Sequence, residues 1–276
     1  MITAERIKRS YDRYAQNYDS GTQLQRSLAD KLINAVQLDG IKFSKVLDIG
    51  CGTGYLLSSL RAERSEAKQS PIFGKEIASV ASLPRNDGIV GCDISFGMLN
   101  CARDKGSRYV QSDASVLPFS NSIFDLVVSN AAYQWVRDLK TAFSEVKRVL
   151  KPAGKFYFVV FNNNTLWQLQ DVCKGINVAG KNFPDKDKLH SSLAEAGFKI
   201  DSIEIFSYVK YYKDLWELLG TLKNIGSTSA DNKVKGLAWR AILQQVNDLY
   251  IAKFANENGI PATYEVFLIN VYQAAA

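Results

Sequence analysis

Residues 46–54, VLDIGCGTG, place one acid and three glycines at the end of an apolar run. The run predicts a buried strand, and a glycine-rich turn after a strand lets the backbone approach a bound ligand closely. The glycines Gly50, Gly52 and Gly54 are spaced G-x-G-x-G, with Cys51 as a spacer and Asp48 two residues before the first. This pattern predicts recognition of a nucleotide-like ligand, and Asp48 limits which ligand it is.

Two common phosphate-binding turns do not match. A dinucleotide turn reads G-x-G-x-x-G, but the third position is Tyr55 counted from Gly50 and Leu57 counted from Gly52. The Gly-Lys-Ser/Thr of a P-loop is also absent. A carboxylate at Asp48 would repel a pyrophosphate held at the helix N-terminus. S-adenosylmethionine instead carries an ammonium that an acid attracts and a carboxylate that backbone N–H groups can bind, so the pattern favours this cofactor.

Further motifs follow in the chain. VLDIGCGTG, GCDIS, QSDASVLPF and FDLVVSNAAYQWV resemble, in order over residues 46–161, the motifs of class I S-adenosylmethionine-dependent methyltransferases. The resemblance implies a cofactor site with the following members: the loop residues Asp48, Gly50, Cys51, Gly52 and Gly54, Asp93 on the ribose hydroxyls with Ile94 beside it, Asp113 on the adenine amino group with Ala114 adjacent, Asn130 beside the methyl-transfer site, and Tyr18.

Apolar runs alternate with amphipathic helical patterns through the first half of the chain, which predicts an α/β fold with a mostly parallel sheet and helices on both faces. The resemblance implies the Rossmann-like methyltransferase fold. We expect four parts, which are cap helices at 1–40, a cofactor-binding core at 41–212, a helical cap at 213–261 and a last core strand at 262–276.

Residues 62–88 do not fit the alternation. They mix acids, bases, serines and prolines with little apolar periodicity, which predicts an exposed surface insert. Asp93 lies 39 residues after Gly54, against about 20 in dinucleotide-binding units. The insert accounts for that excess.

Composition narrows the class of protein. The chain of 276 residues has no run of eighteen apolar residues and begins with a polar, charged segment, so we expect neither a membrane span nor a secretory signal. The four cysteines lack CxxC spacing and predict reduced thiols. We expect a cytoplasmic monomer without a metal site, and we assign no role to His190, the only histidine.

Two features that the sequence lacks limit the choice of methyl acceptor. Acceptors that are base or amide nitrogens usually require Asn/Asp-Pro-Pro-Tyr/Phe after the fourth strand, but here the stretch is Asn130-Ala-Ala-Tyr133. No histidine or cysteine is placed to act as a base, and a carboxylate acceptor, already ionised at neutral pH, needs none. The net charge of +6 favours an anionic partner. The chain has no run of five or six consecutive basic residues, so the sequence does not indicate a nucleic-acid partner.

The segments YDRYAQNYDSGTQLQRSLADKL, SNAAYQWV, LLGTLKNIGS and TYEVFLI resemble the malonyl-acyl carrier protein O-methyltransferases of biotin synthesis. This resemblance implies methyl esterification of the malonyl carboxylate on an acyl carrier protein. No catalytic side chain is assigned. The implied contacts are Tyr11 and Tyr18 over the cofactor, Tyr18, Asn130, Gln134 and Trp135 at the acceptor, and Lys223 or Arg148 as a cation for a carboxylate or the carrier, although Arg148 is better explained as a surface helix residue.

Other acceptors stay open on the residues alone. The first alternative is another small-molecule acid or a quinone-type hydroxyl. The second is an assembly factor or hydroxylase with the methyltransferase fold that acts on a protein partner.

Overall fold

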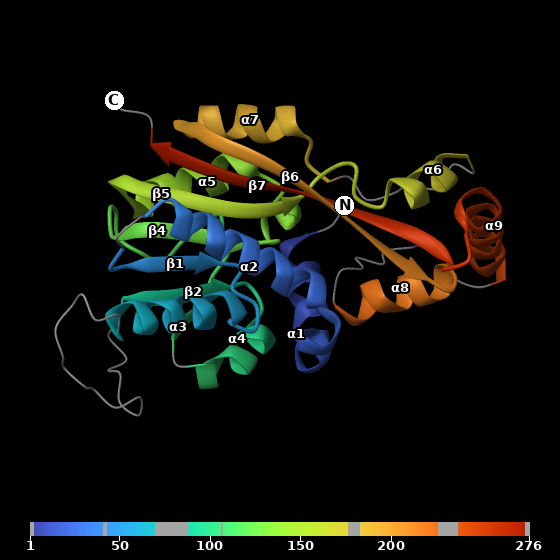
Figure 1. Cartoon of the computed structure of the whole chain (residues 1–276), viewed down its shortest axis with the longest axis horizontal. Helices are drawn as coiled ribbons and strands as arrows, with labels where there is room; N and C mark the ends of the chain where they lie inside the picture. Colours follow the sequence, from blue (N-terminus) through green and yellow to red (C-terminus); the bar gives the residue numbers. More distant parts are fainter. Residues whose placement is uncertain are drawn as a thin grey trace.

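The computed structural model describes residues 3–40, 43–69, 88–105, 107–175, 183–225 and 237–273. Within these ranges the strands form one seven-stranded sheet in the order β3-β2-β1-β4-β5-β7-β6 (Figure 1). The strands are β1 (Val46–Ile49), β2 (Ile89–Asp93), β3 (Arg108–Gln111), β4 (Phe124–Asn130), β5 (Leu150–Phe161), β6 (Phe198–Tyr212) and β7 (Ile260–Gln273). Strands β1 to β5 are parallel, whereas β7 pairs antiparallel with both β5 and β6.

The helices lie on both faces of this sheet and beyond one end of it (Figure 1). They are α1 (Ala4–Gly21), α2 (Gln23–Leu38), α3 (Tyr55–Gln69), α4 (Phe96–Ala102), α5 (Leu139–Val149), α6 (Trp167–Gly175), α7 (Lys186–Glu195), α8 (Leu215–Asn224) and α9 (Leu237–Phe254), with short 3₁₀ turns η1 (Arg103–Lys105) and η2 (Tyr133–Trp135). No helix within the described ranges is long and apolar enough to cross a membrane.

Successive strand residues point to opposite faces, which divides the core into two clusters. On β1, Val46 joins a cluster with α2, α3, α6, α8 and α9, and Leu47 joins a cluster with α5 and α7. Asp48 has the same parity as Val46 and therefore points toward the α2 side. The strand alternation thus decides which helices surround this acid.

The strand order reverses between β1 and β4. In open parallel sheets, ligands bind at such a switch point, outside the carboxyl ends of the strands. Asp48, Asp93 and Asn130 all lie at those ends, on β1, β2 and β4. The predicted α/β fold is confirmed, and its topology alone gathers the predicted motifs at one edge.

Some boundaries differ from the sequence expectation. Helix α3 continues into the predicted insert as far as Gln69, and the remainder of that insert, 70–87, lies outside the described residues. Strand β5 follows α5 directly, and Pro152, Ala153 and Gly154 lie within it. There the pairing with β4 changes register, from Phe124↔Leu150 to Leu126↔Lys155. The final strand begins at Ile260 rather than 262, and residues 274–276 lie outside the described part.

Candidate functional site

The glycine loop joins β1 to α3 in a conformation that side chains rarely adopt. The φ angles of Gly50, Gly52 and Gly54 are 73°, 54° and 81°. A Cβ on Gly50 would lie 2.3 Å from the Cβ of Ala132, so the segment after β4 approaches the loop directly. The glycines are therefore required both for the turn and for this close approach.

The loop N–H groups are largely used inside the protein. The amides of Gly50 and Cys51 donate to the carbonyl of Cys92 at 2.8 and 3.0 Å, and that of Gly54 donates to the carbonyl of Cys51 at 2.9 Å. The amide of Gly52 donates to Oδ2 of Asp93 at 2.9 Å. These four amides therefore already have hydrogen-bond partners within the protein.

Asp93 lies at the end of β2 with its carboxylate fixed from two sides. Besides Gly52, the amide of Ser95 donates to its Oδ1 at 2.8 Å, and the Ser95 hydroxyl caps α4 by accepting from Met98 N. Burial raises the pKa of Asp93 to about 6, although the two amide hydrogen bonds lower it. A ligand that donates hydrogen bonds to this carboxylate would stabilise its ionised form.

A cavity of about 370 Å³ opens between the glycine loop, helix α1 and the segments that follow β3 and β4. Of the predicted site residues, it is lined by Tyr18, Gly50, Gly52, Asp93, Ile94, Asp113, Ala114, Asn130, Trp135 and Tyr11. This set holds every nucleoside-binding residue that the motifs predict. The larger cavity therefore has the size and the acids to accept a nucleoside.

A second, smaller cavity of about 40 Å³ lies on the α2 side of the loop and is lined by Asp48, Cys51, Gln25 and Arg26, among others. Asp48 is 1% exposed, and neither carboxylate oxygen has a hydrogen-bond partner within the described structure. Burial, and then the charge of Asp93, raise the pKa of Asp48 well above its usual range. A buried carboxylate without donors is costly unless a ligand supplies them.

Arg26 adds the opposite charge to the same cavity. Its guanidinium lies 5.3 Å from the ring centroid of Tyr55, and one of its terminal nitrogens lies 3.6 Å from Oδ2 of Asp19. Its buried Nε has no hydrogen-bond partner among the described residues. An acid and a base in one small cavity match the ammonium and carboxylate of an amino acid, so the donor set fits S-adenosylmethionine across the two cavities.

Four residues line both cavities, namely Tyr18, Asn130 and the loop glycines Gly50 and Gly52. Asn130 donates through Nδ2 to the carbonyl of Gln25 at 2.8 Å, while its buried Oδ1 has no partner in the described structure. Burial, and then Asp93 and Asp19, raise the pKa of Tyr18, so its phenol stays neutral. The junction thus offers neutral polar groups between charged ends.

Aromatic side chains form the outer wall of the larger cavity. The ring of Tyr11 lies edge-on to Tyr18, with centroids 6.2 Å apart, and edge-on to Trp135, with centroids 5.9 Å apart. Gln134 lines neither cavity, and its Nε2 donates to the carbonyl of Ala131 at 2.5 Å. Trp135 therefore lies at the predicted acceptor side, and Gln134 is held against the backbone.

The two candidate cations outside the motifs lie elsewhere. Arg148 is bound to Glu145 at 2.6 Å and donates to the carbonyls of Leu117 and Phe119 at 2.8 and 2.6 Å. Its donors hold the segment before β4, which explains why it is not available for an acceptor. Lys223 is exposed in the last turn of α8 and lines neither cavity.

The sequence reasoning missed Gln25, Arg26, Thr53 and Asp19. All four line the smaller cavity. The apolar stripe of α2 was visible in the sequence, but the direction of its polar face depends on how α2 packs on the sheet. Asp19 did carry a signal, because it belongs to a repeated Tyr-Asp pair in α1.

The sequence of this chain is similar to those of known methyltransferases. Residues 73–158 match the family described as "Methyltransferase domain". The malonyl-[acyl-carrier protein] O-methyltransferase of Methylovorus sp. (strain MP688) is 31% identical over 290 residues, covering 100% of this chain and 91% of the relative. The protein of the same name from Geobacter sulfurreducens is 29% identical, covering 96% and 97%.

Solved structures share the fold at low identity. A methyltransferase from Bacillus halodurans C-125 superposes with a TM-score of 0.59 at 18% identity, covering 90% of this chain and 100% of that one. The YcgJ protein from Bacillus subtilis gives 0.56 at 19% identity, with the same coverage. Both likenesses concern the fold, which is the Rossmann-like architecture expected from the motifs.

Proposed function

The chain belongs to the malonyl-[acyl-carrier protein] O-methyltransferase family, and on that premise we propose that it transfers a methyl group from S-adenosylmethionine to the free carboxylate of a malonyl thioester on an acyl carrier protein. The observation that carries the proposal is the pair of joined cavities, which have charged ends and a neutral junction. The sulfonium supplies an electrophilic methyl group when the cofactor is bound. The chain's own residues would bind the cofactor, orient the acceptor and exclude water.

The residues would divide the cofactor between the cavities. In the larger cavity, Asp93 would accept hydrogen bonds from the ribose hydroxyls, and Asp113 would accept one from the adenine amino group. Asp48 would meet the ammonium and Arg26 the carboxylate, in the smaller one. Charges at both ends fix the position of the atom between them, so the methyl group would lie at the junction beside Asn130.

The reaction needs alignment more than proton transfer. One oxygen of the malonyl carboxylate forms a bond to the methyl carbon as the bond from that carbon to sulfur breaks, and no proton moves. Among the described residues that line the two cavities there is no histidine. The neutral phenol of Tyr18 and the aromatic wall of Tyr11 and Trp135 would exclude water and orient the acceptor. A phenolic acceptor would instead need a base, so a carboxylate suits these walls better.

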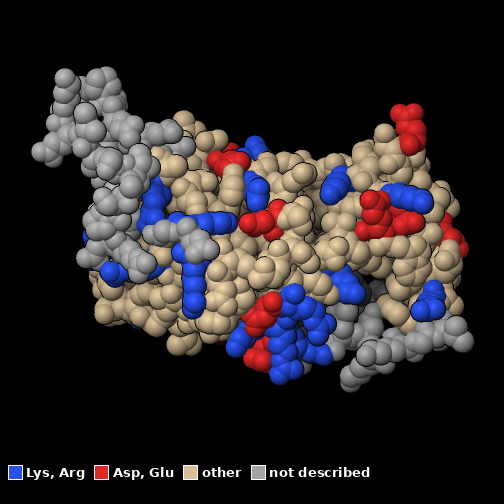
Figure 2. All heavy atoms as spheres, turned by 90° about the horizontal axis from the view of Figure 1, so that it is seen from below, with Lys and Arg blue, Asp and Glu red and all other residues tan. Residues whose placement is uncertain are grey.

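The charge of the outer surface supports an acidic protein partner. Figure 2 shows a dense group of Lys and Arg side chains, with some Asp and Glu side chains among them, on the face seen from below. On α1, Arg6, Arg9 and Arg13 are exposed, while Ile7 and Tyr11 of the same helix line the larger cavity. An anionic carrier docked on α1 would therefore place its acyl group near the cavity wall.

The test is a transfer assay with labelled cofactor. Malonyl-acyl carrier protein should acquire one base-labile methyl ester per malonyl group, while the carrier without a malonyl group should acquire none. Asp93→Ala serves as the control that loses cofactor binding. Wild-type protein that binds the cofactor but leaves the malonyl-carrier unlabelled would refute this acceptor. Binding without any S-adenosylhomocysteine from a cell extract would refute methyl transfer altogether.

A further inference from the structure

Helix α1 carries the dipeptide Tyr-Asp twice, as Tyr11-Asp12 and Tyr18-Asp19. The spacing of seven residues is close to two turns of an α-helix, so the two tyrosines share one side and the two aspartates share another. Both tyrosines line the larger cavity. Both aspartates bind elements of the core, and the two attachments can be followed separately.

Asp12 fastens the middle of α1 to the start of α4. Its Oδ1 accepts from the Ser95 hydroxyl at 2.7 Å and from the Gly97 amide at 2.8 Å. Gly97 permits this contact, because a Cβ there would lie 2.9 Å from the Cα of Asp12. The amide N–H of Ser95 also donates a hydrogen bond to Oδ1 of Asp93. The attachment of α1 is therefore one residue removed from the carboxylate proposed to hold the ribose.

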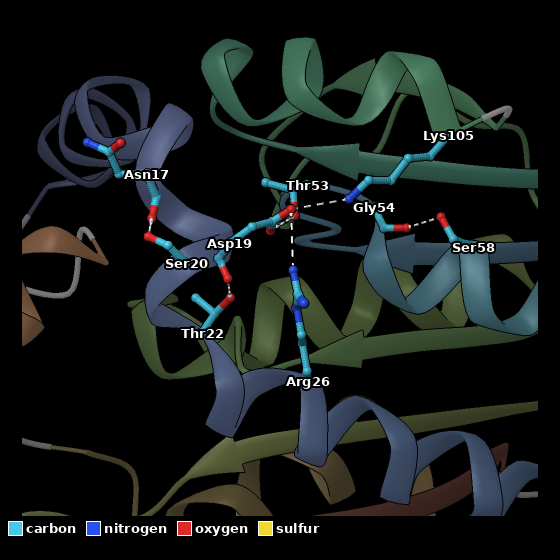
Figure 3. Close-up of polar contacts among 9 residues, drawn as sticks. All are labelled: Asn17, Asp19, Ser20, Thr22, Arg26, Thr53, Gly54, Ser58 and Lys105. Carbon is cyan, nitrogen blue, oxygen red and sulfur yellow. Dashed lines mark hydrogen bonds and ion pairs between the residues drawn. The ribbon is translucent and has the colours of Figure 1, made fainter.

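Asp19 fastens the end of α1 to the glycine loop, as Figure 3 shows. Its Oδ1 accepts from the Thr53 hydroxyl at 2.5 Å. Its Oδ2 lies 3.5 Å from Nζ of Lys105 and 3.6 Å from a guanidinium nitrogen of Arg26. One carboxylate thus joins α1 to the loop, to η1 and to α2, and one of its partners is the cation of the smaller cavity.

We propose that Asp12 and Asp19 are positioning residues, which clamp α1 across the cavity, hold Tyr11 and Tyr18 against the cofactor and slow its release. Because α1 contributes a wall of the larger cavity, loosening this helix removes part of the contact surface that retains a bound cofactor. The inference rests on the proposed function insofar as the cavity holds S-adenosylmethionine. It does not depend on the acceptor.

The first test removes the contacts of the Asp19 carboxylate. Dissociation of S-adenosylhomocysteine is followed by stopped-flow tryptophan fluorescence, since Trp135 lines the cavity. Asp19→Ala should accelerate release about tenfold to a hundredfold, as expected for a lost charge-assisted contact. Thr53→Val removes only the partner hydroxyl and should give part of that acceleration. Combined with Asp19→Ala, it should add nothing further, because both changes break the same bond.

The second test separates Asp12 from a general structural effect. Asp12→Ala should also accelerate release, whereas Asp12→Asn keeps an acceptor oxygen for Ser95 and Gly97 and should release at nearly the wild-type rate. Glu5→Gln is the matched control, because Glu5 is an exposed acid of the same helix that pairs only with the exposed Arg9 among the described contacts. It should leave the rate unchanged.

A measurement without cofactor checks the clamp itself. Hydrogen–deuterium exchange of the ligand-free protein should show faster exchange in α1 of both alanine variants, with α5 and α7 unchanged. Unchanged release and unchanged α1 exchange in the alanine variants would overturn the proposal, as would multiplicative effects of Asp19→Ala and Thr53→Val. A failure of malonyl transfer alone would leave these results untouched and would count against the proposed acceptor instead.

Discussion

The buried carboxylate of Asp93 should make the ligand-free protein less stable at neutral pH than in mild acid. Its pKa is about 6 in the folded chain, against an ordinary value of 3.8. The folded state therefore holds the proton more tightly than the unfolded state between these two pH values. The stability that comes from this group is fully present below about pH 4, falls as the pH rises, and is lost above about pH 6.

The size of the effect follows from the same two values. They differ by about 2 pH units, and each unit corresponds to about 1.4 kcal/mol, so the ionised side chain costs about 3 kcal/mol at pH 7. Asp93→Asn removes the titration. The asparagine can still accept from the Ser95 amide through Oδ1, but its NH₂ group would face the Gly52 amide. That lost bond lowers stability by about 1 kcal/mol at every pH.

The assay is urea unfolding of ligand-free wild-type and Asp93→Asn proteins at a series of pH values from 4 to 8. The wild type should be the more stable protein near pH 4 and the less stable one at pH 7, with a total change of about 3 kcal/mol in the difference between them. S-adenosylhomocysteine at pH 7 should stabilise the wild type strongly and the variant weakly, because the variant lacks the ribose acceptor.

Parallel stability profiles for the two proteins across this range would refute the reasoning. They would mean that the Gly52 and Ser95 amides fully compensate for the burial of Asp93. The neighbouring Asp48 is present in both proteins, but the charge of Asp93 helps to raise its pKa. Asp93→Asn therefore also lowers the pKa of Asp48, and the comparison reports on the two carboxylates together.

Three further predictions concern single positions. Gly50→Ala should destabilise the fold by at least about 2 kcal/mol in urea unfolding, because of its positive φ and the contact with Ala132, and adding Ala132→Gly should restore only the steric part. Arg148→Lys should cost about 2 kcal/mol of stability, because lysine cannot reproduce its fork of contacts, with cofactor affinity unchanged by calorimetry. Burial acts to raise the pKa of Asp125, but hydrogen bonds from Lys151 and from the backbone before β1 lower it overall. Wild type should therefore exceed Asp125→Asn in stability at pH 6 and lose that advantage as the pH falls below about 4, and equal stability at pH 6 would contradict this.

The fold was predictable because its signals are local. Continuous apolar runs predicted the parallel strands, and parallel strands place their ligand-binding turns at one carboxyl edge. The strand order itself was not predicted and comes from the structure. Asp48 could be read as a clue to the ligand from its place before the glycines. The extent of α3 was not predictable, because charged and serine-rich composition suits an exposed helix as well as a loop.

The charged partners of the site depend on packing that no local pattern records. Arg26 belongs to the polar side of α2, and only the contact of α2 with the sheet brings it to Asp48. Arg148 lies three residues after Glu145, a spacing that already indicates an ion pair. Its further bonds to the carbonyls before β4 depend on tertiary structure, and they explain why a cation near a strand is not a ligand for the acceptor.

The position of β7 has a consequence for how the molecule is made. This strand lies between β5 and β6, although it follows both along the chain. During synthesis on the ribosome, β6 therefore emerges before β7, the only strand with which it pairs in the described sheet. Strands β1 to β5 can assemble early. The long strand β6, with exposed Ile205 and Val209, stays unpaired until β7 inserts between it and β5. Nascent chains stalled before residue 260 should thus be the ones that chaperones hold.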